Sequence, residues 1–283
     1  MANRDELEVL ALRSRRLRVS WFPLVTLLAA GACGLAQPAS AEIRQVGVGN
    51  ETIAVEELGG SGPVVIFESG LGEPFDSFTE AAKSLSSCMR VVMYDRPGIG
   101  ASGPRAESGP AMADDVAQGL HALIGKLGLP GPYVVVGHSL GGFYAQIFAR
   151  RYPSDIAAVV LIDAASQFEP PGVFVSKVRP EPGSVAAAEE EGMRLGEATA
   201  NSEPPFPPVP LIVLAATDHE MSADLEQLWQ ATQAKLPGLS PKGKLEVVSG
   251  AGHFIQTDRP DAVIAAVKEA TRDAGLSVET CAP

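Results

Sequence analysis

Residues 133–146 read YVVVGHSLGGFYAQ, in which a Val-rich run ends at a serine flanked by glycines. A short apolar run of this kind is typical of a strand buried inside a parallel sheet. The apolar spacing after the serine predicts a helix. Residues 137–141 match G-x-S-x-G, the pattern of a tight strand-to-helix turn that exposes a serine hydroxyl above a sheet.

The glycines fit this interpretation on steric grounds. In so tight a turn, side chains at 137 and 141 would collide with their neighbours, so glycine is expected there. The turn would push the Ser139 hydroxyl outward, which makes Ser139 a candidate nucleophile. A serine needs a general base, and the base needs a group that orients it.

The candidate base is His253. It lies in GAGHFIQTDRP, directly after the last predicted strand, and it follows Ser139 in the chain as this motif requires. The loop that carries His253 is expected at the carboxyl edge of the sheet, where Ser139 also emerges. The other histidines lie in a predicted helix (His121), in the elbow (His138) and after an earlier strand (His219).

Strands and helices alternate after the N-terminal segment. Alternating apolar and polar residues predict an edge-side strand at 52–58, and apolar runs predict strands at 63–69, 90–95, 133–137, 157–163, 210–216 and 244–249. Helical patterns lie at 76–87, 111–127, 140–151, 223–236 and 260–273. This alternation predicts an α/β fold with a doubly wound, mostly parallel sheet.

The chain resembles the α/β-hydrolase superfamily from about residue 50 to the C-terminus. The resemblance is carried by VVIFESGLG, VVMYDRPGIGAS, VVVGHSLGGFYAQIFARRYP, VVLIDAAS and GAGHFIQTDRPDAVIAAV, in that order. It implies an oxyanion hole formed by the backbone N–H groups of Leu140 and Leu71. It also implies a serine acyl-enzyme, with carboxylic ester hydrolysis as the first interpretation. Aminopeptidase, C–C hydrolase and cofactor-free haloperoxidase-like activities would use the same residues, and a non-catalytic ligand-binding protein on this fold is the alternative of another class.

Two carboxylates compete for the role of the acid that orients His253. Relatives most often carry the acid after the strand that here reads PLIVLAA, where this chain has Asp218 followed by His219 at the usual acid position. The other location in the superfamily is the end of the preceding strand, where LIDAAS supplies Asp163. We favour Asp163 and keep Asp218 as the alternative.

Residues 167–209 interrupt the alternation. The segment is rich in proline, contains GSVAAAEEEGMRLGEA and has no convincing strand. It follows the strand at 157–163 and is expected above the carboxyl ends of the strands, where sites form in open α/β sheets. We therefore expect a small lid within a hydrolase domain at 42–283, with disorder as the alternative.

The first 41 residues form a pattern of their own. A cluster of arginines, an apolar stretch and a final ASA are typical of a secretory signal cut after Ala41, which predicts export to the periplasm or exterior. A retained membrane anchor is the alternative. The chain has a net charge of −12, and loss of this arginine-rich segment would make it more acidic. We therefore expect neither nucleic acid nor an anionic membrane as a partner, and we expect a small acyl substrate.

Three further patterns were weighed. Residues 98–103 satisfy G-x-G-x-x-G, but Pro104 and a polar loop follow instead of a helix, so no dinucleotide cofactor is expected. No cluster has metal-ligand spacing, so no metal is expected. Cys88 and Cys281 would remain in the exported chain, and we expect them to form a disulfide, with free thiols as the alternative.

Overall fold

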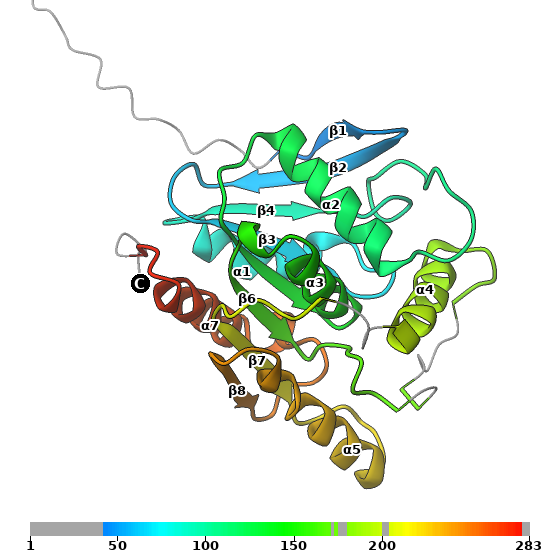
Figure 1. The fold of residues 1–283 in the computed structure, drawn as a ribbon, viewed down its shortest axis with the longest axis vertical. Helices are drawn as coiled ribbons and strands as arrows, with labels where there is room; N and C mark the ends of the chain where they lie inside the picture. Colours follow the sequence, from blue (N-terminus) through cyan, green and yellow to red (C-terminus); the bar gives the residue numbers. More distant parts are fainter. Residues whose placement is uncertain (1–41, 171–172, 175–179, 200–203, 279–283) are drawn as a thin grey trace, which may run out of the picture. The chain divides into compact units, whose positions relative to one another are not determined.

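The computed structural model describes residues 42–170, 173–174, 180–199 and 204–278. Its centre is an eight-stranded sheet with the order β1-β2-β4-β3-β5-β6-β7-β8 (Figure 1). β1 and β2 pair antiparallel, as do β2 and β4, and the other neighbours are parallel. The strands are β1 (Arg44–Val48), β2 (Glu51–Leu58), β3 (Val64–Glu68), β4 (Arg90–Tyr94), β5 (Tyr133–His138), β6 (Ile156–Ile162), β7 (Leu211–Ala216) and β8 (Gly243–Val248).

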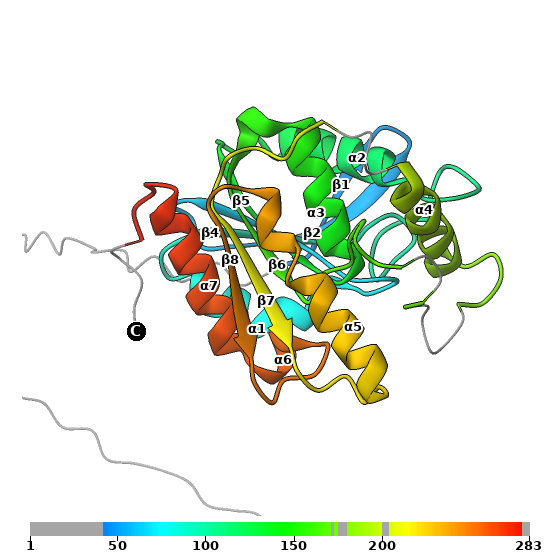
Figure 2. The ribbon, with the colours of Figure 1, turned by 60° about the horizontal axis from the view of Figure 1, so that its bottom comes forward.

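Helices cover both faces of this sheet. The α-helices are α1 (Thr79–Leu85), α2 (Ala113–Leu127), α3 (Leu140–Arg151), α4 (Val185–Thr199), α5 (Ala223–Gln233), α6 (Ile255–Asp258) and α7 (Pro260–Asp273), with short 3-10 turns at η1 (Phe75–Phe78), η2 (Pro153–Asp155) and η4 (Leu236–Leu239). α2 and α3 pack in one core layer, and α1 and α7 pack in the other, on the opposite side of the strands (Figure 2). No helix within the described ranges has the length and apolar character needed to cross a bilayer.

The central strands explain why this arrangement forms. All residues of β3, β5, β6 and β7 are buried, as expected for strands that lie between two helical layers. Their Val- and Ile-rich sequences suit that environment because β-branched side chains pack well on a pleated surface. The doubly wound α/β fold predicted from the sequence is confirmed.

The sequence pattern missed β1 at the edge of the sheet. β1 joins β2 through Gly49 and Asn50, and Val48 pairs with Glu51 across this turn. Gly49 has a positive φ of 57°, which a two-residue hairpin loop requires. The Gly-Asn pair between two runs of alternating polarity was the available signal. β1 is only five residues long and has one buried residue, so its own apolar signal is weak.

The predicted lid contains a helix where it is described. α4 lies apart from the sheet, at the right of Figures 1 and 2. The Ala111 N–H donates to the Ala188 carbonyl at 2.8 Å, and a Cβ on Gly192 would lie 1.9 Å from the Ala111 carbonyl oxygen. α4 is therefore seated closely on the loop that precedes α2. The predicted signal at 1–41 lies outside the described residues.

Only one cysteine of the predicted disulfide lies among the described residues. Cys88 is disulfide-bonded, and Cys281 lies outside the described residues. The pairing of Cys88 with Cys281 therefore stays a prediction.

Candidate active site

Ser139 lies at the turn between β5 and α3. Its φ of 50° and ψ of −121° are unusual for a residue with a side chain, so the turn is strained. A Cβ on Gly137 would lie 2.4 Å from the Gly141 carbonyl oxygen, and a Cβ on Gly141 would lie 2.2 Å from the Glu68 carbonyl oxygen. Both distances are far below van der Waals contact. The steric reason for glycine at 137 and 141 is therefore present in the structure.

His253 and Asp163 lie together beside this turn. The His253 Nδ1–H donates to Asp163 Oδ2 at 2.7 Å, and Asp163 is fully buried directly after β6. The His138 ring, next to Ser139 in the chain, lies 4.7 Å from the His253 ring between centroids. The His138 Nε2–H donates to the His253 carbonyl at 3.0 Å, so the elbow and the His253 loop are joined directly. Because His253 Nδ1 carries the hydrogen that is donated to Asp163, His253 Nε2 is the ring nitrogen that can serve as a base.

Asp218, the alternative acid, follows β7, and its backbone N–H donates to the Ala251 carbonyl at 3.1 Å, next to the His253 loop. Its residue is exposed, and in the described part of the chain no hydrogen bond joins its side chain to His253. Of the two carboxylates weighed from the sequence, the structure brings Asp163 to His253 and leaves Asp218 in the loop after β7.

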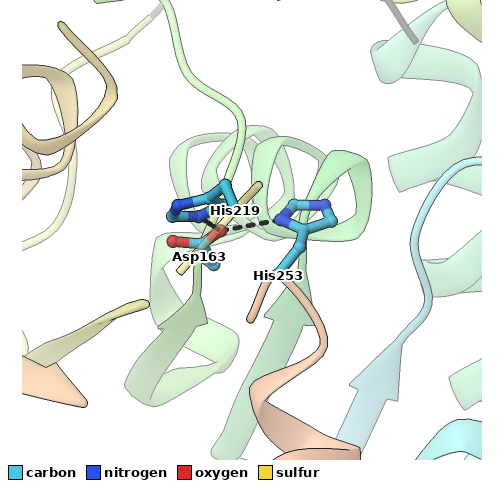
Figure 3. Close-up of side chains that lie close together, drawn as sticks. All are labelled: Asp163, His219 and His253. Atoms are coloured by element: carbon cyan, nitrogen blue, oxygen red, sulfur yellow. Dashed lines mark hydrogen bonds and ion pairs between the residues drawn. The ribbon is translucent and has the colours of Figure 1, made fainter. Parts of the chain in front are cut away.

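The Asp163 carboxylate accepts four hydrogen bonds. Figure 3 shows His219 and His253 both directed at it, and the His219 Nε2–H donates to Oδ2 at 2.6 Å. Oδ1 accepts from the Trp229 Nε1–H at 2.9 Å and from the Ala216 N–H at 3.1 Å. Burial opposes the ionised form, but the hydrogen bonds from His219 and His253 outweigh it and hold the pKa of Asp163 well below its usual range. Asp163 is therefore a fixed anion.

The two histidines on Asp163 differ in their charge preference. Burial lowers the pKa of His253 below its ordinary value, although the hydrogen bond to Asp163 acts in the opposite direction. Burial also lowers the pKa of His219, but the hydrogen bonds to Asp163 and Glu226 outweigh it and raise that pKa. The surroundings of His253 therefore favour the neutral ring, which can accept a proton, and those of His219 favour the protonated ring.

The predicted oxyanion hole consists of the backbone N–H groups of Leu140, next to Ser139, and Leu71 in the loop after β3. Among the described residues, the backbone N–H groups of Leu140 and Leu71 donate to no protein acceptor. The N–H groups on both sides of Leu71 are used, because Gly70 donates to Glu73 at 3.3 Å and Gly72 to Glu189 at 2.8 Å. The loop is thus held by its neighbours while the Leu71 N–H stays available.

A cluster of buried ion pairs contacts the backbone of this loop. Arg96 donates to Glu68 at 2.8 Å and to Glu189 of α4 at 2.6 Å, and all three side chains are almost wholly buried. It also donates to the carbonyls of Ser69 and Gly70, each at 2.6 Å. Burial opposes the charge on Arg96, but the two glutamates raise its pKa well above the usual value. The Arg96 cluster, formed by Arg96, Glu68 and Glu189, therefore ties α4 to the oxyanion loop.

The sequence patterns predicted neither set of partners. His219 and Trp229 reach Asp163 only because β7 lies beside β6, and Glu189 reaches Arg96 across 93 residues of chain. A signal existed for His219, since it stands where relatives carry the acid. For Glu189 there was none, because it is one of several glutamates in a row.

One group of side chains has the composition of a metal site. One ligand atom each of Asp163, His219 and His253 lie within 4.8 Å of one another. The N–O separations of 2.6 and 2.7 Å are those of charge-assisted hydrogen bonds. Metal–ligand distances of about 2 Å would require wider separations, so the geometry fits two N–H donors on a carboxylate.

A cavity of about 440 Å³ lies between α2, the β1–β2 hairpin and α4. Tyr94, Arg96 and Glu189 line it, whereas Ser139 and His253 do not. The cavity therefore borders the Arg96 cluster and is separate from the side chains gathered around Ser139.

Comparisons with known proteins agree with this geometry. A family model described as alpha/beta hydrolase fold matches residues 63–180. "Uncharacterized protein YqjL" of Bacillus subtilis is 26% identical over 74% of this chain and 83% of its own length. "Putative carbamate hydrolase RutD" of Cronobacter turicensis is 34% identical, but over only 36% of this chain and 37% of its own length.

Solved structures extend the likeness beyond the matched segment. A thermophilic esterase from Thermogutta terrifontis superimposes with a TM-score of 0.64 at 21% identity, over 83% of this chain and 99% of that one. At that identity the likeness concerns the fold. The sequence match over residues 63–180 and the likeness of the solved structures together show that the chain has the α/β-hydrolase fold.

Proposed function

We propose that the protein is a serine hydrolase that cleaves carboxylic esters through an acyl-enzyme. One observation supports the proposal: a strained turn carries Ser139 directly after His138, whose ring lies 4.7 Å from the His253 ring, and the His253 Nδ1–H is held by the buried carboxylate of Asp163. A nucleophile, a base and an orienting acid in this order are the requirements of acyl transfer.

The proposed reaction has two halves. The Ser139 hydroxyl attacks the ester carbonyl carbon while His253 Nε2 takes its proton. The carbonyl oxygen becomes an oxyanion that accepts hydrogen bonds from the Leu140 and Leu71 N–H groups. Collapse breaks the bond to the alkoxy oxygen, which leaves as the alcohol with the proton from His253. Water then attacks the acyl-Ser139 ester by the same route and releases the carboxylic acid, while Asp163 stabilises the imidazolium in both halves.

Similarity to the esterase from Thermogutta terrifontis supports esters as the first substrate class. The relative named as a carbamate hydrolase supports carbamates as a second candidate, because a carbamate carbonyl would meet the same nucleophile and oxyanion donors. That relative is matched over 37% of its length, so its activity is a proposal for this chain.

A fluorophosphonate probe tests the proposed nucleophile. We expect wild-type protein to be labelled at Ser139, detected by mass spectrometry of the modified peptide. Ser139→Ala should abolish labelling, whereas Ser154→Ala, which changes an exposed serine, should leave it intact. Absence of labelling in folded wild-type protein would favour the ligand-binding alternative.

The substrate class is tested separately. We expect hydrolysis of p-nitrophenyl esters, with kcat/KM varying with acyl-chain length, and a parallel series of aryl carbamates compares the second class. Labelling of Ser139 without turnover of either series would direct the search to amide, C–C and perhydrolytic substrates.

We also propose that the chain is exported and that residues 167–209 form a lid. Mass spectrometry of the protein from a periplasmic or culture fraction should find an N-terminus at Glu42, whereas an intact Met1 in the membrane fraction would identify a retained anchor.

The contact between α4 and the oxyanion loop supports the lid. Exchange of residues 180–199 for another sequence should change ester selectivity more than it changes fluorophosphonate labelling.

A further inference from the structure

His219 occupies an unusual place beside the proposed triad. It follows β7 and contacts two carboxylates at once, one on each side of its ring. The Nε2 atom lies 2.6 Å from Asp163 Oδ2, and Nδ1 lies 2.9 and 3.0 Å from the two oxygens of Glu226 on α5. Its side chain is only 6% exposed.

These contacts require protons on both ring nitrogens. An ionised carboxylate only accepts hydrogen bonds, and a neutral imidazole has one donor and one acceptor nitrogen. A neutral His219 would therefore direct a lone pair at either Asp163 or Glu226. With both carboxylates ionised, His219 is an imidazolium cation.

A protonated Glu226 could donate a hydrogen bond to a neutral His219 and would also account for these contacts. The surroundings of Glu226 oppose its protonation. Gln230 donates to Glu226 Oε1 at 2.9 Å in addition to the contact from His219. Although burial raises the pKa of Glu226, the hydrogen bonds from Gln230 and His219 outweigh it and lower the pKa. Glu226 therefore stays ionised, and the proton belongs on His219.

The cation fixes the carboxylate that orients His253. Asp163 Oδ2 is shared between His219 and His253, while Oδ1 is held by Trp229 and Ala216. Without the donor from His219, one of the four contacts that prevent rotation of the carboxylate is lost. The negative charge of Asp163 is also compensated by the imidazolium, which limits how strongly Asp163 raises the basicity of His253.

We propose that His219 is a positioning residue: as an imidazolium held between Asp163 and Glu226, it orients the Asp163 carboxylate toward His253 and makes turnover depend on its own proton. The inference rests on the proposed serine-hydrolase function. Among the described residues, the titratable groups that face His219 are Asp163 after β6, Glu226 on α5 and His253 before α6.

The proposal predicts a distinct alkaline limb in the pH profile. The active form carries the proton on His219, so activity is present below the His219 pKa and is lost as the pH rises through it. Glu226 raises that pKa, and Glu226→Gln removes the negative charge. We expect the alkaline limb of kcat to move down by about one pH unit in Glu226→Gln, since a nearby opposite charge shifts a pKa by about 1–3 units.

The direct test is NMR of the free protein labelled with ¹⁵N-histidine. At pH 7.5 we expect both ring nitrogens of His219 to carry the shifts of protonated nitrogens, with the signals assigned by their loss in His219→Gln. A neutral tautomer of His219 at pH 7.5 would overturn the proposal. This readout does not depend on a substrate.

Two substitutions at His219 separate a positioning role from a structural one. His219→Leu removes the donor to Asp163 and should lower kcat about 10- to 100-fold with KM nearly unchanged, the range for a hydrogen bond to a charged group. His219→Gln keeps a neutral amide donor, so it should recover part of that loss and abolish the alkaline limb.

The matched controls are His121→Gln and Asp224→Asn. The first changes an exposed histidine paired with Asp155, and the second removes an exposed negative charge from the same first turn of α5 as Glu226. Both should keep the wild-type pH profile. An unshifted limb in Glu226→Gln, or equal kcat losses in both His219 variants, would contradict the positioning role.

The two proposals fail in different ways. If fluorophosphonate does not label Ser139 but NMR finds an imidazolium at His219, the serine-hydrolase function fails and the charge assignment stands. If Ser139 is labelled and His219 is neutral, the function stands and the inference fails.

Discussion

Two clusters of buried charge flank Ser139, and they are built on different principles. On one side, Asp163 receives hydrogen bonds from two histidines, and the His253 side chain is 33% exposed. On the other side, Arg96, Glu68 and Glu189 form ion pairs in which no side chain is more than 4% exposed. The first cluster joins a carboxylate to two imidazoles, and the second joins a guanidinium to two carboxylates.

This difference follows from what each cluster has to do. The proposed base must gain and lose a proton in each half-reaction, so it needs a pKa near the working pH and access to the substrate. The oxyanion loop only has to stay in place, which a fully charged, fully buried network does well because its geometry is fixed by many hydrogen bonds. The Asp163 side is thus expected to control rate and pH dependence, and the Arg96 side stability.

The largest expected effect is on the rate. Asp163→Asn removes the charge that stabilises the His253 imidazolium and permits the wrong tautomer. We expect kcat for a p-nitrophenyl ester to fall about 10⁴-fold, as for the equivalent change in serine proteases. Asp218→Asn is the matched control and should stay near the wild-type rate. The reverse pattern would make Asp218 the acid.

The next effect is on stability, at the opposite cluster. Arg96→Met leaves Glu68 and Glu189 buried without their cation, and breaking a buried ion pair costs about 3–5 kcal/mol. Urea unfolding followed by circular dichroism should find that loss in the free energy of unfolding. Arg194→Met removes an exposed pair with Glu191 and should change the free energy of unfolding far less. Equal losses of unfolding free energy in the two variants would mean that the buried Arg96 cluster stabilises the fold no more than an exposed ion pair does.

A smaller effect is expected where the elbow meets the oxyanion loop. Gly141→Ala places a Cβ 2.2 Å from the Glu68 carbonyl oxygen and 2.4 Å from that of Ser69, so the loop must shift. We expect a loss of about 1–3 kcal/mol in unfolding free energy and a lower kcat. Gly119→Ala, on the exposed face of α2 with no atom near its Cβ, should instead add up to about 1 kcal/mol. Wild-type kcat in Gly141→Ala would mean that the loop tolerates displacement.

The smallest change concerns the acidic limb of the wild-type pH profile. His253 acts as a base only when neutral, and its pKa is lowered from the ordinary value of 6.5. Activity should therefore be retained as the pH falls to 6.5 and be lost below it, as measured by kcat/KM across pH 4–8. Arg96→Met should leave this midpoint in place if the two clusters act separately. A midpoint above pH 7 would contradict the lowered pKa.

Local patterns predicted much of the fold and the candidate site. Apolar runs and one alternating segment located seven of the eight strands. The signal was clearest for β3, β5, β6 and β7, because a strand buried on both faces needs a continuous apolar sequence. The elbow was readable because its steric demands fall on neighbouring residues, namely Gly137 and Gly141 around Ser139. His253 was readable because its place after the last strand fixes the edge of the sheet at which it lies. Each of these signals is short-range.

The sequence by itself therefore determined the sheet, the elbow and the identity of the proposed nucleophile and base. Only the tertiary structure decided which carboxylate meets His253, and that His219 and Glu226 stand behind it. It also decided that Arg96 binds Glu189 of α4. The physical reason is that a carboxylate, a histidine or an arginine carries no local mark of its partner. Its partner depends on how the strands pair and how the helices pack, because these contacts bring together residues that are far apart in the chain.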